Sequence, residues 1–300
     1  MNPFASRSPA AGYALAVISS IGVAVSTVLG KWNLAAVDPL IMNCLVFSIA
    51  AVAMTIGWLP FRAPETSLKV SARGWLWLVL LAIVQCGAVW LYWLGVQIMD
   101  PSLAAFLNRS RVVIALLLGI LILGERLNRR EAIGTALAMI GIVVMRATLR
   151  LEYTPGFAFV LLGAVLFGVT ELLSKIVVRH VQTSILAYYR NVLIMILYWL
   201  AFAVTGGSFE GVGAVWPGIV ALGLLGPIFN RVLYFSALER LEMVKVSVIG
   251  QIQPVFVIVL SVMLLDMLPS VREMLGGVFL IAGAMVLVVY RRRIRQTFTA

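Results

Sequence analysis

Two arginines lie inside a stretch of the sequence that is otherwise apolar and long enough to cross a lipid bilayer. The stretch covers residues 102–127. Asn108, Arg109, Ser110 and Arg111 follow about ten residues after its start, which is roughly 15 Å deep if the stretch forms a helix. A charged side chain at that depth costs several kcal/mol unless it faces protein or water. We therefore interpret the group as functional, with a structural role at backbone carbonyls or at the interface as the alternative.

The spacing within this group favours Arg111 as a ligand for substrate. Asn108 and Arg111 are three residues apart and share one face of a helix, whereas Arg109 points to another side. A guanidinium holds a carboxylate through two parallel hydrogen bonds. We predict that Arg111, with Asn108 beside it, binds the carboxylate of a small substrate near the middle of the membrane. Which of Arg109 and Arg111 faces the cavity stays open.

Charge inside the predicted spans is not balanced. Four arginines, at positions 109, 111, 190 and 231, accompany one carboxylate, Glu171. Glu171 and Arg231 are each about 15 residues into their spans, so we expect them at one depth and paired as ions. We predict that this pair forms an inner gate when the cavity is open outward, together with Lys175 at the end of the Glu171 span. Arg190 is close to the end of its span and is expected to reach the interface.

Polar and aromatic residues in other apolar stretches complete the predicted cavity. They are Trp90, Tyr92, Asn230, Tyr234, Gln251 and Gln253. Breaks are expected at Gly226-Pro227 and at Pro254, where freed backbone carbonyls could bind substrate. The alternative for the glutamines is hydrogen bonding between helices, and for the rings it is packing against lipid or neighbouring helices.

The composition identifies a membrane protein. Of the 300 residues, 62% are hydrophobic and only 12% are charged, which is typical of a helical protein with many membrane spans. The net charge of +11 comes from short loops and a basic tail, which favours lipid headgroups over nucleic acid as partners. No phosphate-binding loop, metal cluster or nucleophile with a base is found in the sequence, so we expect no cofactor, no metal and no enzyme activity. Cys44 and Cys86 are expected to be reduced thiols.

Ten apolar spans predict an all-α membrane protein. They are residues 10–30, 39–59, 74–99, 102–127, 132–145, 155–178, 184–205, 215–238, 244–265 and 272–290. With the N-terminus inside, fifteen Lys and Arg residues lie on the inner side and four on the outer side. This asymmetry predicts that both termini are cytoplasmic.

The two halves of the chain repeat one another. Gly12 and Gly156 begin corresponding spans and Lys31 and Lys175 end them, each pair being 144 residues apart. Five spans in each half is an odd number, so the second copy must be inverted in the membrane. We therefore predict ten transmembrane helices in two inverted five-helix repeats, residues 1–150 and 151–300. Inverted repeats are typical of transporters that work by alternating access.

This layout resembles the EamA-type drug/metabolite transporter superfamily. The resemblance rests on two five-helix halves, on the Gly-Glu-Arg-Leu sequence at 124–127, and on glycines repeated seven residues apart in spans 132–145 and 272–290. Within the superfamily the chain looks most like the bacterial aromatic amino acid exporters. Family members commonly have a proline early in both fourth spans. Here Pro254 has no counterpart, because Val113 occupies the matching position, so we expect residues 102–127 to form a straighter helix.

The resemblance implies a transporter of the bacterial inner membrane that exports small zwitterionic metabolites. Amino acids, including aromatic ones, are the expected substrates. An exporter of cationic drugs or quaternary ammonium compounds is one alternative and would need Glu171 as its binding carboxylate. A membrane subunit without transport activity is the alternative from another class. The expected partners are a small molecule and the lipid bilayer, with the chain a monomer or a weak dimer.

Overall fold

The computed structural model describes residues 9–57, 68–123, 129–148, 151–178, 180–181, 183–238, 240–241 and 243–290. Within these ranges the chain is helical and contains no strand. Nine of its helical stretches are long and apolar enough to cross a membrane. The predicted span at 132–145 is a helix too, but it falls outside those nine. The predicted Gly-Glu-Arg-Leu feature and the basic tail lie outside the described residues.

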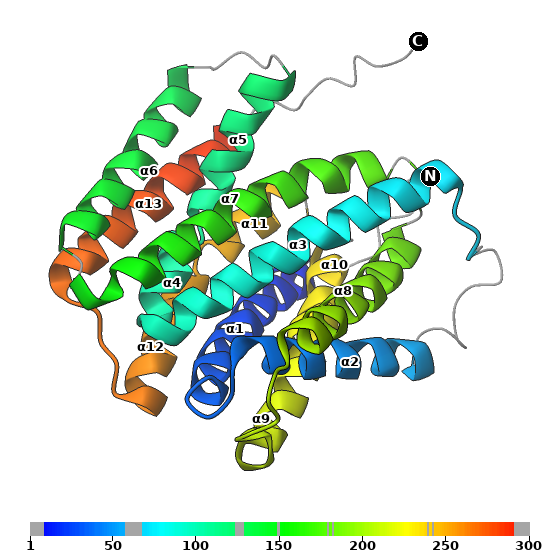
Figure 1. Ribbon diagram of the computed structural model, residues 1–300. Coiled ribbons are helices and arrows are strands. Elements are labelled where there is room, and N and C mark those ends of the chain that lie inside the picture. Colours follow the sequence, from blue (N-terminus) through cyan, green and yellow to red (C-terminus); the bar gives the residue numbers. More distant parts are fainter. Residues whose placement is uncertain are drawn as a thin grey trace, which may run out of the picture.

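The helices follow one another in the order shown in Figure 1. The first half contains α1 (Pro9–Asn33), α2 (Pro39–Gly57), α3 (Ala72–Ile98), α4 (Pro101–Leu107), α5 (Ser110–Leu123) and α6 (Arg129–Thr148). A short turn, η2 (Leu151–Tyr153), leads to α7 (Thr154–Val177), α8 (Thr183–Thr205) and α9 (Val212–Leu224). Then come η3 (Leu225–Phe229), α10 (Asn230–Leu238), α11 (Met243–Gly250), α12 (Gln253–Leu265) and α13 (Val271–Tyr290).

The expectation of a straighter helix at 102–127 was wrong. The stretch is divided into α4 and α5 at Asn108–Arg109. The backbone amides of Arg109, Arg111 and Val112 each bond to the carbonyl three residues earlier, so the chain tightens there without a proline. The matching stretch of the second half is interrupted just before Pro254, between α11 and α12. The expected bend at Gly226-Pro227 takes the form of the π-helical turn η3.

Glycines bring helices from the two halves into backbone contact. A Cβ on Gly141 of α6 would lie 2.6 Å from the carbonyl oxygen of Gly276 in α13, and one on Gly283 would lie 2.5 Å from the carbonyl oxygen of Gly134. Figure 1 shows α6 and α13 lying along each other at one edge of the bundle. Because the residue numbers run in opposite directions along this contact, α6 and α13 are antiparallel. Such close approach requires residues without side chains.

The two ends of the bundle are packed differently. At one end, called here the Lys31 end, the Lys31 ammonium donates to the carbonyls of Val96, Gln97 and Met99, where α3 finishes. Next to it, all seven side chains of α4 are buried. At the opposite end, called the Arg240 end, α10 finishes and α11 begins. Among the five residues of α11 whose burial is described, only Val246 is buried.

Candidate functional site

An ion pair lies between α5 and α7, inside the membrane-spanning part of the bundle. The Nε atom of Arg111 is 3.8 Å from Oε1 of Glu171, and the two side chains are 35% and 47% exposed. The Arg111 guanidinium also lies over the ring of Phe167, 5.9 Å from its centroid. The break between α4 and α5 positions Arg111 in the first turn of α5, and Phe167 and Glu171 are one turn apart on α7. A cation, an anion and an aromatic ring therefore meet at one accessible point.

This pair differs from the predicted gate. Glu171 was expected to pair with Arg231, and in this structure its partner is Arg111. Equal depth in two spans does not determine which sides of the two helices face each other, so depth alone could not identify the partner of Glu171. Arg231 is partly exposed, and the charge of Arg111 acts on it across the interior. The gating role assigned to Glu171 and Arg231 therefore stays a prediction, as does that of Lys175, whose side chain lies outside the described residues.

Arg109 is the more buried of the two neighbouring arginines. Its side chain is 6% exposed, and its Nη2 donates to the side-chain oxygen of Gln253 at the start of α12. The two residues are 144 positions apart, the offset found between the sequence repeats. The positive charge of Arg111 also repels that of Arg109. The accessible cation is therefore Arg111, while Arg109 joins the two interrupted helices.

Asn230 acts as a packing residue between α10 and α1. Its amide Nδ2 donates to the hydroxyl of Ser26, and its backbone carbonyl accepts from the hydroxyl of Ser19. A Cβ on Gly22 would lie 2.0 Å from the Asn230 side-chain oxygen, so a larger residue there would require the Asn230 side chain to move. This geometry agrees with hydrogen bonding between helices more than with contact to a substrate. The sequence signal for it was the row of small residues Ser19, Gly22 and Ser26 on one side of α1.

The two aromatic candidates of α3 lie on different sides of that helix. Tyr92 is buried, and its ring is 5.3 Å from that of Trp93 and 6.4 Å from that of Phe167. Tyr92 therefore extends the aromatic wall beside Arg111. Trp90 is 44% exposed and continues an exposed row with Leu76, Leu80 and Ile83. That row has the spacing of one helix face, which places Trp90 toward lipid instead of toward the ion pair.

The remaining polar candidates are distributed along the interior. Gln251 is buried at the break before α12, and Tyr234 packs near the Arg240 end against a cluster that includes Ala16 and Leu241. The Oδ1 atom of Asn108 is buried and has no hydrogen-bond partner among the described residues. Arg190 is partly exposed and donates to the side-chain oxygen of the adjacent Asn191, and its reach to the interface stays a prediction.

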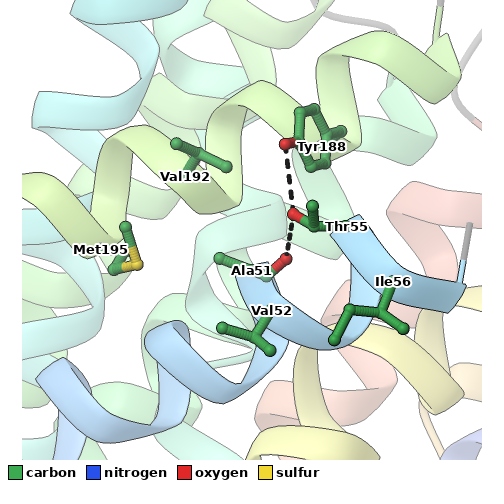
Figure 2. A pocket seen from close by; sticks show the side chains of 7 residues that line it. All are labelled: Ala51, Val52, Thr55, Ile56, Tyr188, Val192 and Met195. Atoms are coloured by element: carbon green, nitrogen blue, oxygen red, sulfur yellow. Dashed lines mark hydrogen bonds between the residues drawn. The ribbon is translucent and has the colours of Figure 1, made fainter. Parts of the chain in front are cut away.

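Two grooves on either side of α2 lie away from these residues. The groove between α2 and α8 has a volume of about 260 Å³ and is mostly aliphatic. Figure 2 shows that the Tyr188 hydroxyl bonds to that of Thr55, which in turn donates to the carbonyl of Ala51. The second groove, of about 300 Å³, lies between α2 and α9 beside Trp216. None of the predicted binding residues lines either groove.

These features define a class of protein before any comparison. Many apolar helices, interrupted near the middle of the membrane beside ionised side chains, are typical of membrane transporters. The profile of the EamA-like transporter family matches the chain twice, over residues 10–147 and 154–289. The chain belongs to this family, so it is a multi-pass membrane protein of a transporter family.

Two curated relatives and one solved structure are similar to the chain. The Uncharacterized transporter sll1164 of Synechocystis is 21% identical over 73% of this chain, and that match spans 66% of the Synechocystis protein. The Uncharacterized transporter YwfM of Bacillus subtilis is 28% identical over 49% of both chains. A crystal structure described only as that of a protein matches 94% of this chain and 99% of its own, with a TM-score of 0.65 at 22% identity. That likeness concerns the fold alone.

Proposed function

We propose that the protein is a secondary transporter that exports small zwitterionic metabolites, amino acids including aromatic ones being the first candidates. The observation that carries this proposal is the accessible Arg111–Glu171 pair against Phe167. A zwitterion has one anionic and one cationic group a few ångströms apart. Placed between the two side chains, its carboxylate would bind Arg111 and its ammonium would bind Glu171.

The geometry allows a substrate to replace the contact between Arg111 and Glu171 at a small cost in free energy. An ion pair at 3.8 Å between half-exposed side chains contributes little by itself, so a substrate can separate it. After binding, two ion pairs replace one and the net charge of the site is unchanged. Asn108, whose side-chain oxygen is unsatisfied among the described residues, precedes Arg111 by three positions and can supply a further polar contact. The rings of Phe167 and Tyr92 offer an apolar surface for a large substrate side chain.

The architecture that we propose for transport is two inverted five-helix repeats, residues 1–150 and 151–300, with ten membrane helices. Two successive matches to one family profile support it. So do the antiparallel glycine contact of α6 with α13 and the contact of Arg109 with Gln253. Exchange of conformation between the repeats would give alternating access through a central cavity. We further propose a bacterial inner-membrane location, cytoplasmic termini from the charge asymmetry, and a monomer or weak dimer.

A second function is favoured by the exposure of Glu171. An exporter of cationic drugs would need an accessible carboxylate inside the membrane, and Glu171 is 47% exposed. Its partner Arg111 opposes this function, because a monovalent cation would leave a guanidinium unpaired beside it. The two functions therefore differ in what they require of Arg111.

The deciding experiment measures flux of radiolabelled tryptophan, phenylalanine, threonine and a quaternary ammonium compound in proteoliposomes. Loss of a charge-assisted contact costs about 1.5–3 kcal/mol, so Arg111→Ala should weaken amino acid binding roughly 10- to 100-fold. Arg111→Lys should restore it only in part, because lysine lacks the planar fork. Arg272→Ala, at an exposed position, is the matched control. Flux of the ammonium compound alone, unaffected by Arg111→Ala, would establish the drug exporter instead.

A further inference from the structure

Arg109 is a buried cation without a counter-charge in the described part of the chain. Its side chain is 6% exposed, and the group that it contacts, the amide oxygen of Gln253, is neutral. The nearby charge of Arg111 is of the same sign and is already opposed by Glu171. A buried guanidinium that has no anion beside it is strongly unfavourable, which indicates that something else supplies the negative charge.

Two helix starts converge at the same point. Arg109 immediately precedes α5, which has 14 residues, and its partner Gln253 is the first residue of α12, which has 13. The amides of Arg111, Val112 and Val255 already bond to carbonyls three residues earlier, and Pro254 has no N–H, so the two starts contribute the positive ends of their helix dipoles, about half a charge each. The guanidinium and the two helix starts therefore add their positive potentials at one buried location.

Ser110 provides an independent observation at this location. It is the first residue of α5 and is completely buried, at 0% exposure. Its hydroxyl oxygen has no hydrogen-bond partner within the described residues. A buried hydroxyl without a partner is unfavourable, whereas a bound anion would accept its hydrogen bond.

We propose that Arg109 and Ser110 form a binding site for one monovalent anion at the junction of the two interrupted helices, where the start of α12 adds its helix dipole. The site is separate from the Arg111–Glu171 pair, and only its carboxylate form rests on the proposed export function. Its ligand is a compact anion that accepts several hydrogen bonds, either a solvent halide or the carboxylate of a transported molecule. Each half of the chain contributes to it through Arg109 and Gln253. Occupancy would therefore stabilise the junction between the halves.

The test is thermal unfolding of the full chain in detergent at constant ionic strength. The probes are sodium chloride and sodium acetate, with the bulky sulfonate MES as the reference anion. We expect a compact anion to raise the unfolding temperature by a few degrees in a saturable manner. Chloride active alone identifies a halide site, and acetate active alone identifies a carboxylate site. No saturable rise with either anion would overturn the proposal.

Three variants separate this site from its neighbours. Arg109→Gln should raise the half-saturating anion concentration roughly 10- to 100-fold, and Ser110→Ala, which removes one neutral hydrogen bond, should raise it about 3- to 10-fold. Arg111→Gln removes an adjacent cation and should leave the response to acetate or chloride in place. An equal response in wild type and Ser110→Ala would contradict the site even if Arg109→Gln fails to fold. Because the readout is not flux, failure here leaves the proposed export function untouched, and the reverse also holds.

Discussion

The short helices α4 and α11 are the first parts of corresponding interrupted spans, yet they are buried to different extents in the bundle. All seven residues of α4 are buried beside the Lys31 end, whereas α11 has one buried residue among the five whose burial is described. With the two halves inverted, as we propose, this contrast indicates one conformation of the transporter, in which the Lys31 end is sealed and the Arg240 end is open. With the termini cytoplasmic, as we propose, the open end faces the cytoplasm. Exchange of the two conformations would expose α4 and bury α11.

Cysteine labelling of α4 and α11 tests whether the two ends of the bundle are closed to different extents. Cys44 and Cys86 are first replaced by alanine. Ser102→Cys in α4 is then treated with a membrane-impermeant maleimide in right-side-out vesicles, and Val248→Cys in α11 in inside-out vesicles, so that the reagent reaches each end from its own side. Since a buried thiol reacts only during opening, position 102 should react at least about 100-fold more slowly than position 248. Equal rates, or faster labelling of position 102, would show that the two ends are not sealed differently.

The seal itself can be broken at Lys31. Its ammonium satisfies three carbonyls at the end of α3, so Lys31→Met leaves these acceptors unpaired near a buried part of the bundle. Removing charge-assisted bonds worth about 1.5–3 kcal/mol should increase labelling of Ser102→Cys roughly 10- to 100-fold. Lys69→Met, at an exposed lysine, is the control and should leave labelling unchanged. No increase in Lys31→Met would remove Lys31 from the seal.

The packing that holds α4 can be compared with the looser surroundings of α11 by adding one methyl group to each. A Cβ on Gly277 of α13 would lie 2.6 Å from the ring of Phe106 in α4, whereas a Cβ on Gly250 at the end of α11 meets nothing within 4 Å. Gly277→Ala should lower the free energy of unfolding by about 1–3 kcal/mol. Gly250→Ala should leave it unchanged or raise it by up to about 1 kcal/mol. Unfolding in denaturant measures both, and similar losses would contradict the difference in packing.

The smallest effect is expected from the hydroxyl of Tyr153. It donates to a carboxylate oxygen of Asp100, at the turn before α4, over a long distance of 3.4 Å. Tyr153→Phe should therefore lower the free energy of unfolding by about 0.5–1 kcal/mol and slightly increase labelling of position 102. Tyr13→Phe, on an exposed ring, serves as the control. A loss above that of Gly277→Ala would mean that this bond is a principal part of the seal.

The sequence was sufficient for those features that depend on local chemistry. Apolar length predicted the helices, and proline correctly located the interruptions at Gly226-Pro227 and before Pro254. The interruption at Asn108–Arg109 has no local signal, because neither proline nor glycine is present. It accompanies a contact between Arg109 and Gln253, which are far apart in the chain. A helix that bends to satisfy a distant partner cannot be recognised from its own residues.

The candidate site shows the same limit. Counting residues along a span gives the depth of a side chain but not the direction in which it points. Glu171 was therefore matched with Arg231 at equal depth, although its partner is Arg111. Trp90 and Tyr92 were grouped together, although two positions on a helix point to nearly opposite sides. In a helix that is apolar on every side, no pattern distinguishes the side facing lipid from the side facing the cavity. Phe167 was missed for this reason.

The charged ends of α6 have a consequence for the surrounding lipid. Arg129, Arg130 and Glu131 begin this helix and Arg146 lies in its last turn. The apolar part between them, residues 132–145, is only about 21 Å long, compared with roughly 30 Å for the hydrocarbon core of a bilayer. Its exposed Ile133, Ile140 and Val143 nevertheless face outward. The mismatch requires the bilayer to become thinner beside α6, or its arginines to extend toward the headgroups, so the protein should be sensitive to acyl-chain length.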